Sequence, residues 1–304
     1  MKKQATLFIC LASLLLPIIA NGQIEDKTSI VAKGAKVEKA GEGYNFTEGP
    51  AVAKNGDVYF TDQPNDRIHK WSASDGKVTL FMENTDRSNG MYFDKNGMLI
   101  SCADLDNSLV AISPDGTIAE TLISEYLGNK LNGPNDVWVA PNGGMYITDP
   151  LYKRSWWTRS PDMQQDGEHV YYLSADRNTL IRVEDSLAKP NGIIGTPDGK
   201  KLYVADIGAG KTYEFDILPD GKLANKKLFA ELGSDGMTID NKGNIYLTGK
   251  GVTVFNPQGE QIAQIPIEER WTANVVFGGK DRKTLFVTAM GSVYTLKMKV
   301  KGVY

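Results

Sequence analysis

Side chains that carry oxygen recur at a fixed position along the chain. Each lies eleven or twelve residues before a hydrophobic or aromatic residue that follows a short turn. Four neutral amides and two carboxylates, gathered in one place, would suit a hard divalent cation, because Ca²⁺ accepts about 6–8 oxygen ligands. The pattern predicts one such ion, with Ca²⁺ favoured and Mg²⁺, Mn²⁺ or Zn²⁺ as alternatives. The six pairs are Glu48 with Tyr59, Asn89 with Ile100, Asn135 with Tyr146, Asn191 with Tyr203, Asp235 with Tyr246, and Asn274 with Phe286.

The same residues have a simpler interpretation as turn formers. Asn and Asp tolerate left-handed backbone and hydrogen-bond locally, and Gly follows Asn at 89, 132 and 191. Glu48 fits this interpretation less well, because glutamate is a poor turn former. We therefore favour a ring of ligands and keep the turn interpretation as its alternative.

The element pattern that must position this ring is strand, tight turn, strand, repeated at intervals of roughly 38 to 60 residues. Such a repeat is typical of a β-propeller, and six repeats predict an all-β fold of six blades around one axis. In a propeller the innermost strands line the central channel, so residues at one phase of the repeat converge there. The absence of a linker after residue 40 predicts a single domain over residues 23–304.

The two ends of a propeller must meet, because the first and last blades would otherwise expose strand edges. Residues 28–31 and 35–39 read as short strands that precede the first repeat. We expect this N-terminal segment to complete the sixth blade beside residues 284–288 and 292–299.

Residues 1–22 have the layout of a secretory signal peptide. Lys2 and Lys3 precede an apolar stretch from Ala5 to Ile19, and small residues follow at the cleavage position. A membrane anchor is the alternative, but about fifteen apolar residues are fewer than the ~20 that a spanning helix needs. The sequence predicts an exported protein, periplasmic or secreted, without a membrane span.

The charge balance limits the class of partner. The formal charge is −3 for the whole chain and would be −5 without Lys2 and Lys3. An acidic chain is not expected to bind nucleic acid. Without the predicted signal peptide, residues 23–304 contain a single cysteine, Cys102, so no intramolecular disulfide is expected. Nothing in the sequence fixes the oligomeric state.

Other residue types offer little catalytic chemistry. The two histidines, His69 and His169, read as strand residues away from the channel mouth, and Cys102 reads as a small buried hydrophobe. Neither a phosphate-binding loop nor a dinucleotide-binding glycine motif is present.

Carboxylates also follow a strand of several repeats. Asp149 and Asp206 could act on a substrate, but Asp62 and Asp104 occupy the same point of the repeat. A residue that recurs in four blades is better explained as a structural carboxylate.

The third repeat contains a long insertion, residues 151–168. It carries Trp156 and Trp157 together with basic residues. Long loops in compact folds are often functional, and this composition suits a lid over a polyhydroxylated or anionic substrate. A patch that binds a partner is the alternative.

Five short motifs together resemble the senescence marker protein, gluconolactonase and luciferin-regenerating enzyme family, from about residue 40 to the C-terminus. Members of that family are six-bladed, calcium-dependent hydrolases. The insertion after Asp149 follows no pattern of the family. The motifs are Phe46-Thr47-Glu48-Gly49-Pro50, Asn132-Gly133-Pro134-Asn135-Asp136, Thr148-Asp149-Pro150, Pro190-Asn191-Gly192 with Leu202-Tyr203-Val204-Ala205-Asp206, and Ser234-Asp235-Gly236-Met237.

The resemblance implies roles for four ring residues. Glu48, Asn135, Asn191 and Asp235 match the positions that hold the metal in this family, and Asp235 matches its proposed general base. The remaining candidates for substrate contact are Asn89, Asn274, Trp156 and Trp157.

The resemblance also implies a reaction, the metal-dependent hydrolysis of a lactone. A sugar lactone such as gluconolactone is the expected small-molecule substrate, with the metal polarising the carbonyl and a carboxylate assisting water attack. A phosphotriesterase, a lactonase of broad specificity and a non-catalytic ligand-binding propeller remain alternatives.

Overall fold

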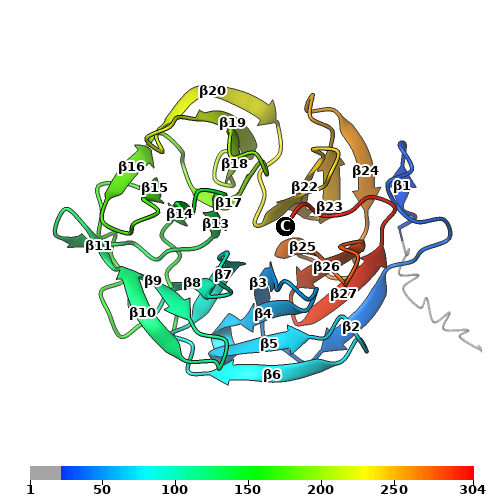
Figure 1. Cartoon of the computed structure of the whole chain (residues 1–304), viewed down its shortest axis with the longest axis horizontal. Helices are drawn as coiled ribbons and strands as arrows, with labels where there is room; N and C mark the ends of the chain where they lie inside the picture. The colour runs from blue at the N-terminus through cyan, green and yellow to red at the C-terminus, as the bar shows by residue number, and fades with distance from the viewer. Residues whose placement is uncertain (1–21) are drawn as a thin grey trace, which may run out of the picture.

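The computed structural model describes residues 22–304 as a six-bladed β-propeller. Six antiparallel sheets surround one axis (Figure 1). In each, the strands run outward from the axis in chain order, except that two N-terminal strands are added to the outer edges of the fifth and sixth sheets. The predicted fold is confirmed. Residues 1–21 lie outside the described part, so the predicted signal peptide at 1–22 falls almost wholly beyond it.

The first three blades have four strands each, ordered from the axis outward. The first contains β3 (Thr47–Val52), β4 (Val58–Asp62), β5 (Arg67–Trp71) and β6 (Val78–Glu83), with the short 3₁₀ helix η1 (Gln63–Asn65) after β4. The second contains β7 (Ser88–Phe93), β8 (Leu99–Ala103), β9 (Ser108–Ile112) and β10 (Ile118–Ile123), followed by a hairpin of β11 (Glu125–Tyr126) and β12 (Asn129–Lys130). The third contains β13 (Val137–Val139), β14 (Met145–Asp149), β15 (His169–Leu173) and β16 (Leu180–Glu184).

The last three blades repeat this order. The fourth contains β17 (Pro190–Gly195), β18 (Lys201–Asp206), β19 (Lys211–Ile217) and β20 (Leu223–Ala230). The fifth contains β21 (Met237–Ile239), β22 (Ile245–Gly249), β23 (Gly251–Phe255) and β24 (Gln261–Ile265). The sixth contains β25 (Asn274–Gly278), β26 (Thr284–Ala289), β27 (Ser292–Lys297) and, on its outer edge, β2 (Glu38–Glu42).

The N-terminal segment closes the sixth blade, as predicted, but with different residues. β2 pairs with β27, so the strand spans residues 38–42 rather than 35–39. The expected strand at 28–31 is wrong, since only Val31 forms an isolated bridge there, to Met298. Asp26 explains the difference, because its carboxylate accepts the amide hydrogens of Ile30 and Val31 and bends this segment into a loop. A short strand that the sequence did not reveal, β1 (Glu25–Asp26), extends the fifth blade.

The core lies between neighbouring blades. Middle strands such as β8, β14 and β26 are buried at every position, whereas outer strands such as β10 are mostly exposed or half-buried. Every hydrophobic partner of the six predicted pairs but Tyr59 is buried. This packing holds the inner strands at fixed positions around the axis.

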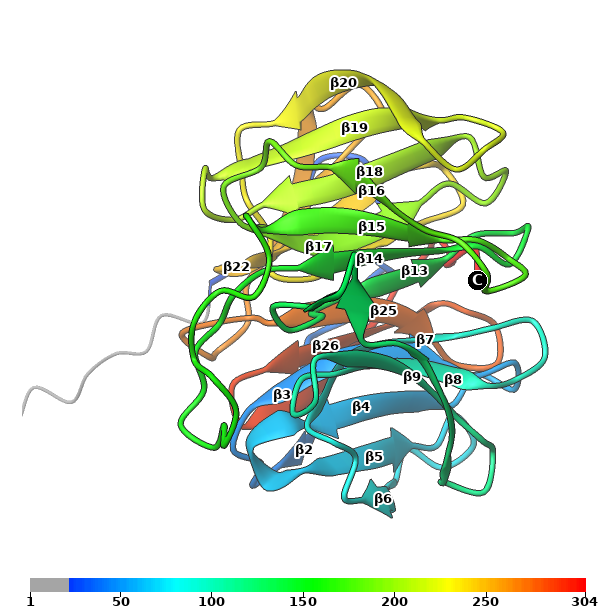
Figure 2. The same ribbon diagram turned by 90° about the vertical axis from the view of Figure 1, so that its left-hand side faces the viewer.

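The two faces of the propeller differ. The C-terminal end crosses one face, whereas the insertion 151–168 projects from the opposite one (Figure 2). Tyr304 reaches the axis, where its hydroxyl accepts a hydrogen bond from Trp138 Nε1 at 3.2 Å and its ring packs edge-on against Tyr92. No helix among residues 22–304 is long and apolar enough to cross a membrane.

Candidate active site

The six oxygen-bearing residues form one ring at the axis. Each lies at or just before the start of an inner strand, four within β3, β7, β17 and β25 and two just before β13 and β21. Five of the side chains are buried, and Asp235 alone keeps partial exposure. The ring consists of Glu48, Asn89, Asn135, Asn191, Asp235 and Asn274.

The glycines that follow ring residues allow the inner strands to approach closely. A Cβ at Gly49 would lie 1.8 Å from the Asn89 carbonyl oxygen, and a Cβ at Gly236 would lie 1.9 Å from Cγ of Asn274. No side chain fits at such distances. The motifs in which glycine follows a ring residue therefore reflect blade packing at the axis more than turn formation.

Asp235 is held by two neighbouring side chains, one at each carboxylate oxygen. Trp271 Nε1 donates to Oδ2 at 2.7 Å, and Asn191 Nδ2 donates to Oδ1 at 2.8 Å. The same amide nitrogen of Asn191 lies 2.9 Å from the hydroxyl of Tyr152. Asp235 lies in the loop that precedes β21, and these contacts fix the orientation of its carboxylate there.

Glu48, in the first blade, is hydrogen-bonded to Asn274 of the sixth blade. Its Oε2 accepts hydrogen bonds from Asn274 Nδ2 at 3.0 Å and from the backbone N–H of Gly49. Asn274 Oδ1 in turn accepts the N–H of Val275 at 2.8 Å. Both polar ends of the Asn274 side chain are thereby engaged within the protein, so its predicted contact with substrate stays a prediction.

Repulsion and burial disfavour negative charge on the ring. Burial raises the pKa of Glu48 well above its usual range, and the nearby Asp235 adds to the effect. Burial also raises the pKa of Asp235, which hydrogen bonds from Trp271 and Asn191 partly counteract. A bound cation would favour both ionised forms.

The donor set fits a hard divalent cation. Oδ1 of Asn89 is buried without a hydrogen-bond partner among residues 22–304, and the carboxylates of Glu48 and Asp235 are close enough for the charge of one to affect the other. No group of three or more His, Cys, Asp or Glu side chains in that range is arranged to hold a metal ion. An ion at the ring would thus depend on amide oxygens as well as on Glu48 and Asp235, which favours Ca²⁺.

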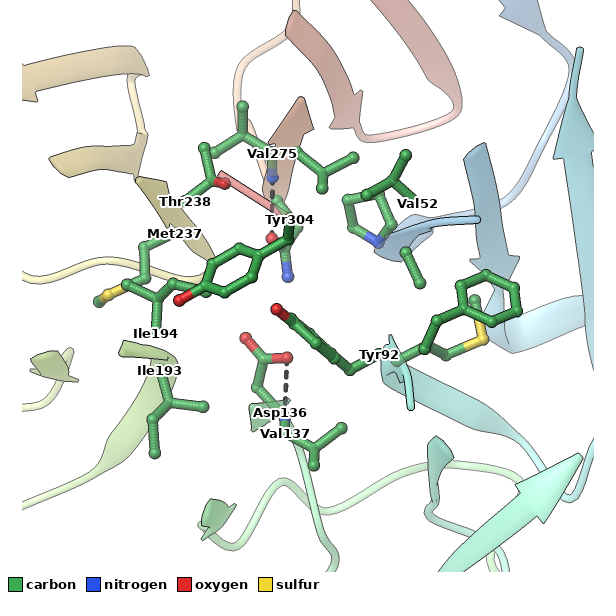
Figure 3. A pocket seen from close by; sticks show the side chains of 16 residues that line it. Val52, Tyr92, Asp136, Val137, Ile193, Ile194, Met237, Thr238, Val275 and Tyr304 are labelled. Atoms are coloured by element: carbon green, nitrogen blue, oxygen red, sulfur yellow. Dashed lines mark hydrogen bonds between the residues drawn. The ribbon is translucent and has the colours of Figure 1, made fainter. Parts of the chain in front are cut away.

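Asp136 is a buried carboxylate outside the six-residue pattern that predicted the ring. It follows Asn135, whereas four of the other five ring residues are followed by glycine, and it accepts the N–H of Val137 at 3.0 Å. Burial raises its pKa to about 7. It lines an axial cavity of about 50 Å³ that also borders Tyr304, and Figure 3 shows its carboxylate and the Tyr92 hydroxyl pointing into this space. An aspartate at a position where glycine is usual was the feature of the sequence that could have identified this residue.

The recurring carboxylates after the second strands serve the structure. Asp149 accepts the N–H groups of Asn132 and Gly133 at 2.9 and 2.8 Å, and Asp206 accepts those of Ala188 and Lys189 at 2.9 and 3.0 Å. Each carboxylate thus holds the loop that leads into its own blade. This agrees with the structural interpretation of these residues.

The other candidates for chemistry lie away from the ring. His69 belongs to β5 and His169 to β15, the third strands of their blades, and His169 Nε2 lies 2.8 Å from Asp166. Cys102 is fully buried in β8. These positions agree with the expectation that the two histidines are strand residues away from the channel mouth and that the cysteine is a buried hydrophobe.

The insertion 151–168 is tied to the ring face at several points. The side chain of Asn132 holds the C-terminal part of the insertion, since Nδ2 donates to Gly167 O at 2.8 Å and Oδ1 accepts the N–H of Gln164 at 2.9 Å. Trp157 Nε1 donates to Asp104 at 3.0 Å, and the Arg159 guanidinium stacks 3.4 Å from a Trp157 ring centroid. The insertion is therefore packed onto the protein rather than detached from it.

Fold and ring together define a class of protein, a six-bladed propeller with an axial set of oxygen ligands suited to a divalent cation. The chain belongs to the SMP-30/Gluconolactonase/LRE-like family, which it matches over residues 46–291. The resemblance deduced from the short motifs is confirmed.

Individual relatives support this assignment. A gluconolactonase of Zymomonas mobilis is 26% identical over 303 residues, which cover 90% of this chain and 84% of that protein. The solved structure of a gluconolactonase from Xanthomonas campestris has a TM-score of 0.81 and 26% identity, and covers 91% of this chain and 98% of that one. The diisopropyl-fluorophosphatase of Loligo vulgaris is 27% identical over 269 residues, which cover 79% of this chain and 84% of that protein.

Proposed function

We propose that this protein is an enzyme that hydrolyses a lactone, and that its substrate is a sugar lactone such as gluconolactone. The observation that carries the proposal is Asp235, a partly exposed carboxylate on the axis of the ring that two side-chain donors hold in place. Gluconolactonase relatives from two bacteria supply the reaction class.

Asp235 is the proposed general base. Its partial exposure lets a water molecule reach the carboxylate, and burial raises its pKa. A carboxylate with a raised pKa is a better proton acceptor for the attacking water. Trp271 and Asn191 keep the accepting oxygens in one orientation during this transfer.

Glu48, Asn135, Asn191 and Asp235 are the proposed ligands of one divalent ion, with Ca²⁺ favoured by the all-oxygen donor set. When bound, such an ion supplies a Lewis acid that polarises the lactone carbonyl. The buried Glu48 suits a ligand better than a base, because both Asn274 and the Gly49 amide direct hydrogen bonds to it. Asn89, with its unpartnered oxygen, is proposed to contact substrate or the ion.

The Asp235→Asn variant tests the base directly. We expect kcat for glucono-1,5-lactone to fall by roughly 10²- to 10⁴-fold, the usual contribution of a general base. Because Asp235 is also a proposed ligand, calcium content is measured on the same sample, and loss of turnover with calcium retained is the expected result. Asp198→Asn, an exposed turn carboxylate, is the matched control. Full activity of Asp235→Asn would remove Asp235 from the mechanism.

Hydrolysis of an organophosphate, a phosphotriester or a fluorophosphate, is the second candidate function. The observation that favours it is the 27% identity to a diisopropyl-fluorophosphatase. A panel of gluconolactones and diisopropyl fluorophosphate separates the two activities. A kcat/KM that is higher for the fluorophosphate would replace the proposed function, and no turnover of either would favour a ligand-binding propeller.

We further propose that the protein is exported to the periplasm or secreted. The basic pair Lys2 and Lys3, followed by an apolar stretch, supports this location. N-terminal sequencing of protein recovered from the periplasmic and culture fractions tests it, and an N-terminus at or near Gln23 is expected. Intact chain found only in the cytoplasm would contradict the proposal.

A further inference from the structure

The Arg154 guanidinium lies beside the ring, at the start of the insertion 151–168. Its Cζ is 5.2 Å from the ring centroid of Tyr152, and the Tyr152 hydroxyl contacts Asn191 of the axial ring. The positive charge of Arg154 is also among the influences that counter the burial-raised pKa of Asp235. Arg154 is thus close to where a substrate would meet the ring.

Arg154 has no hydrogen-bonded carboxylate. Its Nε is buried without a partner among residues 22–304, and the nearest carboxylate oxygen, Oδ2 of Asp104, lies 3.8 Å away. Asp104 is already engaged, because Trp157 Nε1 donates to Oδ2 at 3.0 Å and Arg159 pairs with Oδ1 at 3.3 Å. A donor left unpaired in a partly buried place is costly unless a ligand completes it.

A second donor without a partner lies next to it. Trp156 Nε1 is buried and unpartnered within the described residues, and its indole is 5.7 Å from Arg154 Cζ. Lys189, in contrast, contacts Glu168 at 3.0 Å. Arg154 and Trp156 together offer N–H groups and no acceptor, which is the environment of an anion.

The charges lead to the same conclusion. One divalent cation would balance Glu48 and Asp235, and the Arg159 and Asp104 charges balance each other. Arg154 then remains as a surplus positive charge on this face. A guanidinium binds planar oxyanions with two parallel hydrogen bonds, so a carboxylate, sulfonate or phosphate would be a fitting partner.

We propose that Arg154 and Trp156 form a subsite for an anionic group that the substrate carries on its carbon chain, away from the lactone carbonyl. The substrate class is then the acidic sugar lactones. This inference rests on the proposed lactonase function. The insertion would thereby determine which lactone the ring hydrolyses.

Two lactones that differ in one group test the subsite. D-glucaro-1,4-lactone carries a carboxylate where D-glucono-1,4-lactone has a hydroxymethyl group. We expect the glucaro compound to have the higher kcat/KM. In Arg154→Gln this preference, the ratio of the two kcat/KM values, is expected to fall by roughly 10- to 100-fold, mainly through KM for the glucaro compound, because a hydrogen bond to a charged group is lost. Any change in turnover through the nearby Asp235 affects both lactones alike and cancels in this ratio.

Matched variants separate the subsite from general charge effects. Lys153→Gln removes the same charge from the adjacent, exposed position and should leave the preference intact. Arg154→Lys should restore only part of it, since an ammonium lacks the planar pair of donors. Equal losses on both lactones, or no loss in Arg154→Gln, would overturn the inference while leaving the lactonase function in place.

Binding of products gives a readout that does not depend on turnover. Calorimetry with glucarate, 6-phosphogluconate and gluconate should show tighter binding of at least one of the two compounds that carry the extra anion, and Arg154→Gln should remove this advantage. The two compounds distinguish a carboxylate from a phosphate subsite. If the three affinities are equal, or if Arg154→Gln leaves them unchanged, the subsite is refuted. This outcome would count even if the protein hydrolysed no lactone.

Discussion

Asn274 and Glu48 join the last blade to the first at the axial ring. Their side chains meet through a hydrogen bond of 3.0 Å between Nδ2 and Oε2, although 226 residues separate them in the chain. The same contact therefore joins the first and last blades and orients a proposed metal ligand. Outer-shell partners of this kind commonly tune metal affinity.

The Asn274→Ala variant should weaken calcium binding. Loss of the amide leaves Glu48 without its side-chain partner, and an increase in Kd of roughly 10- to 100-fold is expected. Calorimetric titration of the chelator-treated protein measures this, with Asn256→Ala, on an exposed turn, as the control. An unchanged Kd would show that Glu48 needs no such support or is no ligand.

The Gly49→Ala variant should destabilise the protein strongly. The new Cβ would lie 1.8 Å from the Asn89 carbonyl oxygen, so the first two blades must move apart. The cost is expected to exceed the ~1–3 kcal/mol typical of an overpacked core. Urea unfolding measures the free energy of unfolding.

Gly97→Ala is the comparison for Gly49→Ala. Gly97 also has a positive φ, 84°, but nothing lies within 4 Å of an added Cβ. This variant reports the backbone strain alone. Equal losses of stability in both variants would contradict the close approach of the inner strands.

The free energy of unfolding of the metal-free protein should depend on pH through the carboxyl group of Asp136. Burial raises the pKa of this carboxyl to about 7, above the ~3.9 of an unfolded chain. The folded state then binds more protons than the unfolded state between these values, so the free energy of unfolding should fall as pH rises from about 4 to about 7. Each unit of pKa difference corresponds to about 1.4 kcal/mol.

Asp136→Asn should flatten this dependence, since the amide does not titrate. Chemical unfolding at a series of pH values in the presence of a chelator measures it for both proteins. Identical slopes would mean that Asp136 is not the responsible group. Asp115→Asn, at an exposed turn, serves as the control variant.

The sequence revealed the ring because its members occupy one phase of a structural repeat. The interval between Glu48 and Tyr59, repeated around the propeller, reflects a strand and its hairpin turn, which have fixed lengths. The glycines after ring residues carried a second signal, since Gly49 and Gly236 mark close backbone approach. Local sequence patterns were therefore sufficient to predict the fold and which residues lie at the axis.

The residues that surround the ring could not be found in this way. Trp271 lies in the loop before β25, and Tyr152 and Arg154 lie in an insertion present in one blade only. The contacts of Trp271 with Asp235 and of Tyr152 with Asn191 depend on how the loops fold over this face of the propeller, which a sequence repeat does not describe. The strand expected at 28–31 failed for a related reason, because the Asp26 carboxylate bends the backbone there.

The most direct test of the account is hydrolysis of glucono-1,5-lactone by the purified protein, followed with a pH indicator before and after chelation and with calcium restored. We expect turnover that chelation abolishes and calcium recovers, with calcium bound at one site per chain. Turnover that persists in protein shown to be free of metal would contradict the proposed role of the axial ring.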